Sequence, residues 1–304
     1  MYTRSVLCQA ANCDGIGDGG STSNMKQPPK LRFDTIGYWT EFKLDIIREY
    51  AAAYSRILSR QRQPALYHIY VDAFAGAGIH ISRTTGKSVK GSPLNALEVK
   101  PPFREYHFID LDSSKVSALE KAIGARDDVF IYEGDCNRVL LNQVFPKVRY
   151  ADYRRALCLL DPYGLHLDWE LIKVAGQLRT IDLFLNFPVA DMNRNVLWRN
   201  PECVPQPGIS RMNRFWGDDS WRDIAYSREK DLFGYPEKED NETIASAFRE
   251  RLINVATFGQ VADPIPMRNK QGSTIYYLFF ASQKPVGKDI IEDIFKKYRN
   301  KGVR

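Results

Sequence analysis

Short apolar runs alternate with helical segments through the middle of the chain, and this alternation constrains the fold more than any other feature. Each run is rich in β-branched or aromatic residues and carries Asp or Pro at or near its carboxyl end. Such alternation is typical of an α/β protein with a largely parallel sheet. We therefore predict five strands, over residues 67–74, 105–112, 129–135, 156–162 and 181–188.

A helix is predicted before the first strand. From Trp39 onward, side chains that can share one face recur at three- and four-residue steps. The pattern indicates an amphipathic helix that ends near Gln61, just before Pro64. Its stripe comprises Lys43, Ile47, Tyr50, Tyr54 and Ile57.

Another helix is predicted between the second and third strands. Val116 and Leu119 share a face, and Gly124 stands where a left-handed carboxyl cap is favoured. Asp112 or Ser113 can cap its amino end. The unit is therefore a strand, a helix and a parallel strand.

The chain closes with a predicted antiparallel hairpin. Segments 261–268 and 274–282 flank the turn-rich residues 269–272. Five parallel strands with a closing antiparallel pair are the strand inventory of the S-adenosylmethionine (SAM) dependent methyltransferase variant of the Rossmann fold. We expect this class I, α/β, Rossmann-like sheet, mostly parallel, with a helical and loop insertion.

Composition divides the chain into four parts. Residues 1–34 hold few apolar side chains and no periodicity, so we expect a flexible tail. Residues 35–189 are the predicted SAM-binding core, and residues 241–304 complete it with a helix, the hairpin and a final helix. Between them, 190–240 is expected to be an inserted element that recognises substrate or partner, or else a small separate subdomain.

Charge and cysteine content narrow the class of protein. A net charge of +6 favours a polyanionic partner but is equally common without one. No apolar run approaches the roughly 20 residues that cross a bilayer, so no membrane partner is expected. Five cysteines without paired spacing suit a reducing cytoplasm. Cys8 and Cys13 are expected to be free thiols, and no metal site is predicted.

Residues just after the strands are the candidates for ligand binding, because ligands of open α/β sheets bind at the carboxyl ends of the strands. The first strand leads into a glycine loop in which Asp72 can reach a methionine ammonium. Glycines there allow the close approach and positive φ that an adenosyl group requires, although a tight packed turn would look the same. The candidate cofactor-binding residues are Asp72, Phe74, Ala75, Gly76 and Gly78.

Two further strand ends offer contacts to the adenosyl group. Asp110, followed by Leu111, can accept both ribose hydroxyls, and Asp112 is the alternative if Asp110 caps the helix instead. Asp135 can accept from the adenine amine while the neighbouring backbone N–H, in the run Cys136-Asn137, donates to a ring nitrogen. The alternative for Asp135 is an ordinary Gly-Asp turn.

The fourth strand ends in Asp161-Pro162-Tyr163-Gly164, the most specific local signal in the sequence. Asp161 and the Pro162 carbonyl can both accept from an amine, and so hold its lone pair towards a sulfonium methyl. Tyr163 can stack on a planar base. We assign these three residues to catalysis, the alternative being a strand-terminating turn with a half-buried tyrosine. His166 is a minor candidate for proton transfer.

The inserted element interleaves arginines with aromatic residues, which is the composition of a nucleic-acid surface or of a protein interface. Both partners stay open. The residues are Arg194, Arg199, Arg211, Arg214, Trp198, Phe215 and Trp216.

The runs YVDAFAGAG, FIDLD, GDCN and LLDPYG, in this order, resemble the three-Cys-motif partner (TcmP) proteins. The resemblance covers nearly all of the chain from Trp39 to the YYLFFAS segment. It implies a SAM-dependent methyltransferase, and a partner protein that carries three cysteines.

The DPYG motif also resembles the DPFG of tRNA guanine-N2 methyltransferases and the DPPY of amino-directed DNA and RNA methyltransferases, with Tyr163 at the second Pro of DPPY and Gly164 at its aromatic residue. By similarity to amino-methyltransferases, Lys43 is a further contact, to the methionine carboxylate; the alternative is a solvated helix lysine. A polar, basic loop is expected over 79–91, with Arg83 able to close over ligand.

Together these features predict a cytoplasmic methyltransferase that moves a methyl group from SAM to an exocyclic amine of a nucleobase in DNA or RNA. Two alternatives remain: a non-catalytic SAM-binding scaffold for a three-cysteine protein, and a methyltransferase acting on a small molecule or peptide.

Overall fold

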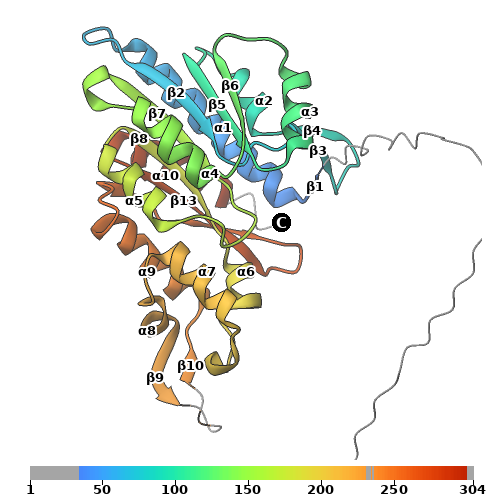
Figure 1. The fold of residues 1–304 in the computed structure, drawn as a ribbon, viewed down its shortest axis with the longest axis vertical. Coiled ribbons are helices and arrows are strands. Elements are labelled where there is room, and N and C mark those ends of the chain that lie inside the picture. The colour runs from blue at the N-terminus through green and yellow to red at the C-terminus, as the bar shows by residue number, and fades with distance from the viewer. Residues whose placement is uncertain (1–33, 231–233, 235, 300–304) are drawn as a thin grey trace, which may run out of the picture. The chain divides into compact units, whose positions relative to one another are not determined.

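A mixed eight-stranded sheet organises the residues that the computed structural model describes, namely 34–230, 234 and 236–299. Its strand order is β11-β13-β8-β7-β2-β5-β6, and β12 pairs with β13 beside β11 (Figure 1). The expected tail, 1–34, lies outside the described residues except for Asp34, as do Cys8 and Cys13.

Five neighbouring strands of the sheet are parallel. Each ends one or two residues earlier than predicted, because the chain leaves the ladder where the polar or proline residues begin. The strands are β2 (Tyr67–Asp72), β5 (Glu105–Asp110), β6 (Val129–Glu133), β7 (Arg154–Leu160) and β8 (Ile181–Phe187).

The predicted hairpin is present and completes the sheet. The strand β13 (Thr274–Ser282) runs antiparallel to β8 on one side. On its other side lie β12 (Ile265–Arg268) and the short β11 (Gln260–Val261), both antiparallel. Parallel strands closed by this antiparallel insertion make the fold an α/β, Rossmann-like sheet of the class I SAM-methyltransferase type.

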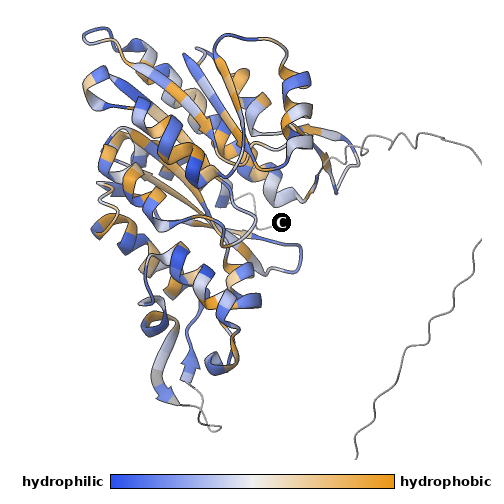
Figure 2. Cartoon of the chain, in the orientation of Figure 1, coloured by the Kyte–Doolittle hydropathy of each residue, from blue (hydrophilic) through white to orange (hydrophobic). Residues whose placement is uncertain are grey.

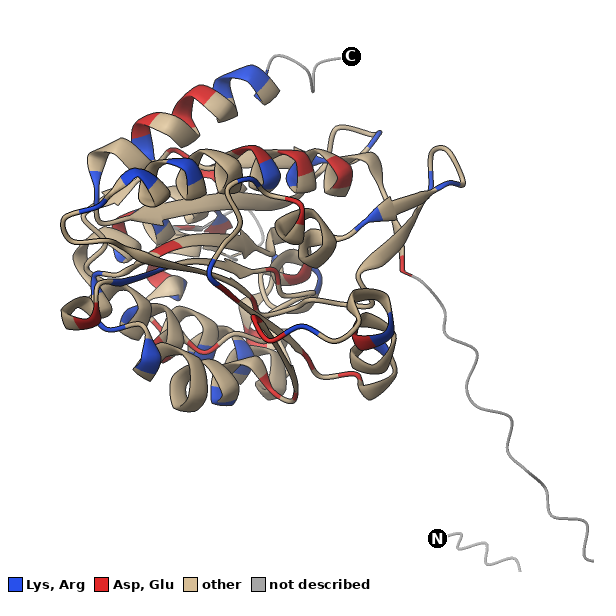
Figure 3. Ribbon diagram, turned by 90° about the horizontal axis from the view of Figure 1, so that it is seen from above, with Lys and Arg blue, Asp and Glu red and all other residues tan. Residues whose placement is uncertain are grey.

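Helices cover both faces of the sheet. One face packs against α1 (Tyr38–Arg60), α2 (Ser92–Leu97), α3 (Ser113–Ile123) and α10 (Pro285–Arg299). The other packs against α4 (Cys136–Val139), which continues as a π-turn and a 3-10 turn to Lys147, and against α5 (Trp169–Leu178), α7 (Gln206–Trp216) and α9 (Asn241–Asn254). Most of the charged residues lie on the helices and loops around the sheet (Figure 3).

Alternation along the strands divides the core between the two faces. In β7, Leu157 and Leu159 contact the α1 side, whereas Cys158 and Leu160 contact the α5 side. This two-residue period buries side chains on both faces of β7, and much of the central part of the sheet is coloured hydrophobic in Figure 2. Because the strands are held by this packing, the residues at their carboxyl ends are held in fixed positions along one edge of the sheet.

The prediction of an irregular basic loop over 79–91 is wrong. Residues there form a hairpin of β3 (Ile79–Ser82) and β4 (Ser88–Lys90), and β3 also pairs with β1 (Thr35–Ile36). Gly86, with a φ of 68°, lies in its turn. A short run of alternating side chains such as IHIS was too brief to be recognised as a strand.

The inserted element consists of α6 (Val189–Asn195), a 3-10 turn (Pro201–Cys203), α7, α8 (Trp221–Ala225), β9 (Tyr226–Lys230) and β10 (Pro236–Lys238). Its large aromatic side chains face inward: Phe215, Trp216 and Trp221 are buried in the core on the α5 side. The expectation that Phe215 and Trp216 form a stacking surface for nucleic acid is therefore wrong. They pack around Phe248 of α9 instead.

A half-buried carboxyl group, that of Asp182, joins α1 to the sheet. The Tyr50 hydroxyl donates to Asp182 Oδ2 over 2.6 Å, and the Ser282 hydroxyl donates to Oδ1 over 2.6 Å. Burial raises the pKa of Asp182 to about 6. The folded protein consequently binds this proton more tightly than the unfolded chain does.

Asp182→Asn should remove a pH dependence of stability. Because the folded-state pKa is raised, wild-type stability from this group falls as the pH rises from about 4 to about 6, by at most about 3 kcal/mol. The asparagine side chain has no proton to lose at this pH, so the stability of the variant should rise relative to that of the wild type between about pH 4 and pH 6. Urea unfolding between about pH 4 and pH 7 measures the difference. Parallel curves would contradict the assignment.

Candidate functional site

Four aspartates follow four adjacent parallel strands. In the order β7, β2, β5 and β6, these strands end at or just before Asp161, Asp72, Asp110 and Asp135. Parallel strands direct their carboxyl ends to one edge of a sheet, so the four carboxylates lie along the same edge.

The glycine loop after β2 turns back onto the end of β5. Gly76 and Gly78 have φ of 64° and 79°, in the left-handed region that glycine adopts without strain. The Gly76 N–H donates to Asp110 Oδ2 over 2.8 Å, and the Asp112 N–H donates to Oδ1 over 2.9 Å. Asp110 is thus fixed beside the loop with further lone pairs available.

The two acids of FIDLD have separate positions. Asp112 caps α3: its Oδ1 accepts from the Ser114 N–H over 2.8 Å. Asp110 makes no such cap and lies against the loop. Between them, Leu111 is 73% exposed, an apolar side chain at the rim beside the glycine loop.

Asp72 is fully buried at the start of the loop. Its Oδ1 accepts from the Phe74 N–H over 3.1 Å, whereas Oδ2 is buried and accepts no hydrogen bond of normal geometry. Burial raises the pKa of Asp72 to about 7, and the Ser92 hydroxyl opposes that rise. An underused buried carboxylate is a natural acceptor for a cationic group such as the methionine ammonium of SAM.

Residues after β6 serve the fold as well as the predicted site. Asp135 is exposed and caps α4, with Oδ1 accepting from the Arg138 N–H over 3.1 Å. The Asn137 amide donates to the His166 carbonyl and accepts from the Asp168 N–H, so it ties α4 to the segment after DPYG. Cys136 is buried beside it. The adenine contacts predicted here stay predictions.

A cavity of about 430 Å³ opens beside the end of β7. Asp161, Pro162 and Tyr163 line it, together with Phe74 of the glycine loop and Lys43 of α1. The remaining predicted acids, Asp72, Asp110 and Asp135, lie outside its lining. The cavity therefore contains the residues predicted to hold the acceptor, and the acids predicted to hold the adenosyl group lie outside it.

An ion pair closes the inner part of this cavity. The Lys43 ammonium binds Asp161 Oδ2 and lies 5.4 Å from the centre of the Tyr276 ring. Lys43 is only 4% exposed, so the alternative of an ordinary solvated lysine is wrong. The predicted contact of Lys43 with a methionine carboxylate stays a prediction.

The DPYG turn is shaped by contacts with α6. A Cβ on Gly164 would lie 2.8 Å from Asp191 Oδ2, which accepts from the Leu165 N–H over 3.2 Å. Tyr163 is exposed, and its hydroxyl donates to Asp34 over 3.2 Å. The alternative of a half-buried tyrosine does not apply.

Two functional candidates were missed by sequence reasoning. His80 of β3 and Asn186 of β8 line the cavity, and His80 Nδ1 and Asn186 Oδ1 are buried without hydrogen-bond partners among the described residues. Burial lowers the pKa of His80, which favours its neutral form. His166, in contrast, is exposed and does not line this cavity. The position of Asn186 at a strand end was the available signal.

The arginines of the insertion are divided. Arg194 is exposed and lines the cavity, as does Arg83 of the β3–β4 hairpin. Neither forms an ion pair with an acid among the residues described. Arg214 instead pairs with Asp168 over 3.0 Å.

Within the described part of the chain, no helix combines the length and apolar character needed to cross a membrane.

No family model and no curated protein matches the chain. Among solved structures, a Legionella pneumophila protein of family DUF519 is similar over 84% of this chain and 91% of its own, at 12% identity and a TM-score of 0.45. A putative SAM-dependent methyltransferase from Listeria monocytogenes is similar over 81% and 97%, at 11% identity and a TM-score of 0.41. The fold assignment rests on the strand order of the sheet.

Removing the charge of Lys43 should destabilise the protein through Asp161. Lys43→Met keeps an aliphatic side chain of similar length but leaves the partly buried carboxylate of Asp161 unpaired. We expect the free energy of unfolding, measured in urea, to fall by about 1 to 3 kcal/mol. The double variant Lys43→Met/Asp161→Asn should lose less than the sum of the two single changes. Lys121→Met, on the exposed side of α3, is the control. Additive losses would show that the two groups do not interact.

Proposed function

We propose that this chain is a SAM-dependent methyltransferase that acts on an exocyclic amine of a nucleobase in DNA or RNA. The observation that carries the proposal is the pairing of Asp161 with Lys43 in a cavity one strand away from the buried, underused carboxylate of Asp72. The cavity also holds unpartnered buried polar atoms of His80 and Asn186, which suit a polar ligand.

The cofactor half of the proposal rests on the glycine loop. SAM, when bound, supplies the methyl group as an activated sulfonium. Asp72 would hold the methionine ammonium, Asp110 the ribose hydroxyls, and the exposed Leu111 would cover the adenine ring. The residues present fit this ligand, because Asp72 Oδ2 is buried and accepts no hydrogen bond of normal geometry from the described residues, and the loop has the glycine conformations that allow close approach.

The acceptor half rests on DPYG. Asp161 and the carbonyl of Pro162 would accept the two N–H bonds of a planar amine and fix the direction of its lone pair. Lys43 holds the Asp161 carboxylate in place, so that it is oriented before substrate arrives. The neutral imidazole of His80, at the same cavity, can take the proton that the methylated amine loses.

A nucleic-acid substrate is favoured over a small neutral molecule by the charges around the cavity. Of the acids in the lining, Asp34 and Asp161 are paired with Lys115 and Lys43, and Asp191 accepts from the Leu165 N–H and the Asn195 side-chain amide. Arg83 and Arg194 have no acidic partner among the described residues. An arginine pair of this kind, at the rim of a site for a planar base, suits the phosphates on either side of that base.

Asp161→Ala tests the acceptor half. Methyl transfer to nucleic acid should fall by at least about 100-fold, because the amine loses its oriented acceptor, while SAM affinity stays within a few fold. Calorimetry with SAM and mass analysis of nucleosides measure the two effects separately. Asp127→Ala, an exposed acid after α3, is the control. Equal loss of binding and transfer would contradict this division of roles.

Asp110→Asn and Asp112→Asn test the cofactor half as a matched pair. The first should weaken SAM binding by about tenfold or more, because a charged acceptor beside the glycine loop is lost. The second should leave SAM affinity unchanged and lower stability by about 1 kcal/mol at most, because Asp112 caps α3. Calorimetry and thermal unfolding distinguish these outcomes.

Two results would redirect the proposal. If the wild-type protein binds SAM but transfers no methyl group to DNA or RNA from cells that lack the gene, the scaffold alternative is favoured. If it binds no SAM, the proposal is wrong.

A further inference from the structure

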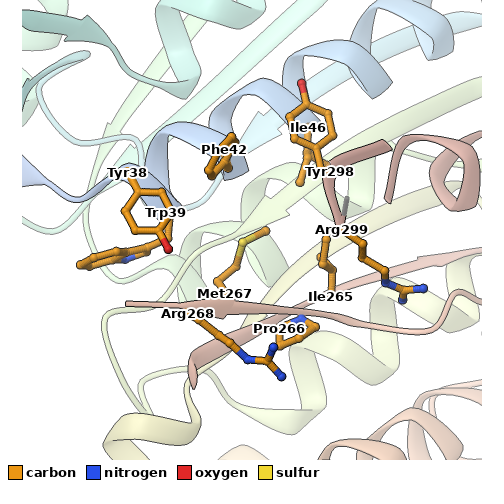
Figure 4. A pocket seen from close by; sticks show the side chains of 10 residues that line it. All are labelled: Tyr38, Trp39, Phe42, Ile46, Ile265, Pro266, Met267, Arg268, Tyr298 and Arg299. Atoms are coloured by element: carbon orange, nitrogen blue, oxygen red, sulfur yellow. The ribbon is translucent and has the colours of Figure 1, made fainter. Parts of the chain in front are cut away.

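A second cavity, of about 310 Å³, lies beside the first and is lined by aromatic and basic side chains. It is formed between α1, β12 and the end of α10, and Figure 4 shows its side chains. The lining residues are Tyr38, Trp39, Phe42, Ile46, Ile265, Pro266, Met267, Arg268, Tyr298 and Arg299.

Trp39 is the wall between the two cavities, since it lines both. Its indole packs over the backbone of Gly37, where an added Cβ would overlap the ring. The strands connect the cavities too: Met267 of the second cavity is paired with Tyr276 of the first in the β12–β13 ladder. The two cavities are therefore neighbours.

The aromatic rings are arranged edge to face. Tyr38 and Phe42 have centroids 5.6 Å apart at an interplanar angle of 84°, and Phe42 and Tyr298 have centroids 6.1 Å apart at 74°. Rings in this arrangement support one another while leaving ring faces to a planar guest. Such a surface binds bases by stacking and does not require a particular base.

The charge of the cavity is positive. Among the described residues that line it are Arg268 and Arg299 and no acid. Arg268 is exposed and forms no ion pair with an acid among the described residues, and Arg299 donates to the backbone carbonyl of Asp263 over 3.1 Å. The nearby Glu49 is paired with Lys297 over 2.7 Å. Aromatic faces beside unneutralised guanidinium groups complement a base and its phosphate.

We propose that this cavity binds the nucleotide next to the methyl-accepting one in a single-stranded nucleic acid, stacking its base on the Tyr38, Trp39 and Phe42 group and holding its phosphate with Arg268. The inference rests on the proposed function, because the first cavity must take the acceptor base. It narrows the substrate to a strand that is unpaired over at least these two positions.

Binding of a short single-stranded oligonucleotide to the full chain, followed by fluorescence anisotropy, tests the site. Phe42→Ala should weaken binding by about tenfold, and the same change should have little effect on an abasic sugar-phosphate strand. Arg268→Gln should weaken binding of both strands by several fold and reduce the salt dependence.

Matched controls come from the same chain. Arg60→Gln removes a positive charge at the far end of α1, roughly 30 Å along the helix from Tyr38. Phe130→Ala removes an exposed ring on β6. Both should leave oligonucleotide affinity unchanged. Thermal unfolding of each variant separates a loss of contact from a loss of fold.

Several outcomes would overturn the site. The first is that the wild-type protein binds no oligonucleotide, and the second is that Phe42→Ala and Phe130→Ala lose the same amount of affinity. The third is that substitution of Phe42 and of Arg268 leaves affinity unchanged, which would mean that the cavity has another occupant, such as a protein partner. SAM binding, measured separately by calorimetry, is expected to be unchanged in all these variants. If the wild-type protein does not bind SAM, the proposed function is refuted, whatever the result of the oligonucleotide experiment.

Discussion

The ion pair between Lys43 and Asp161 joins the two parts of the molecule on which the site depends. Lys43 lies in the helix that precedes the sheet, and Asp161 follows the strand at its centre, 118 residues later. A lysine withdrawn from water needs a partner, and a carboxylate at a strand end needs a fixed direction if it is to orient an amine. One contact meets both requirements, so the packing of α1 and the geometry of the acceptor cavity are coupled.

Much of the architecture could be predicted because it follows from local chemistry. The stripe containing Ile47, Tyr50 and Tyr54 gave the bounds of α1 closely, and the apolar runs located all five parallel strands. The turn at 269–272 predicted the hairpin. Asp110 and Asp112 could be separated only by the structure, because either carboxylate satisfies the sequence pattern for a helix cap.

What the sequence did not reveal depends on contacts between distant segments. Phe215 and Trp216 are residue types that are common in binding surfaces. In the structure they are buried because they pack against Phe248, which α9 brings beside them. No role could be predicted for His80, because nothing beside it in the sequence suggests one and it reaches the cavity through the β3–β4 hairpin. Residue type predicts what a side chain can do, whereas tertiary packing decides which surface it meets.

The position of β13 in the sheet has a consequence for biosynthesis. Its nine residues lie between β8 and the β11–β12 edge, so an interior strand of the sheet is made after all five parallel strands. Until residues 274–282 have left the ribosome, the nascent chain carries β8 as an open, apolar edge that could pair with another chain. Shielding of that edge during translation, a task suited to a chaperone, would therefore favour correct pairing of the sheet.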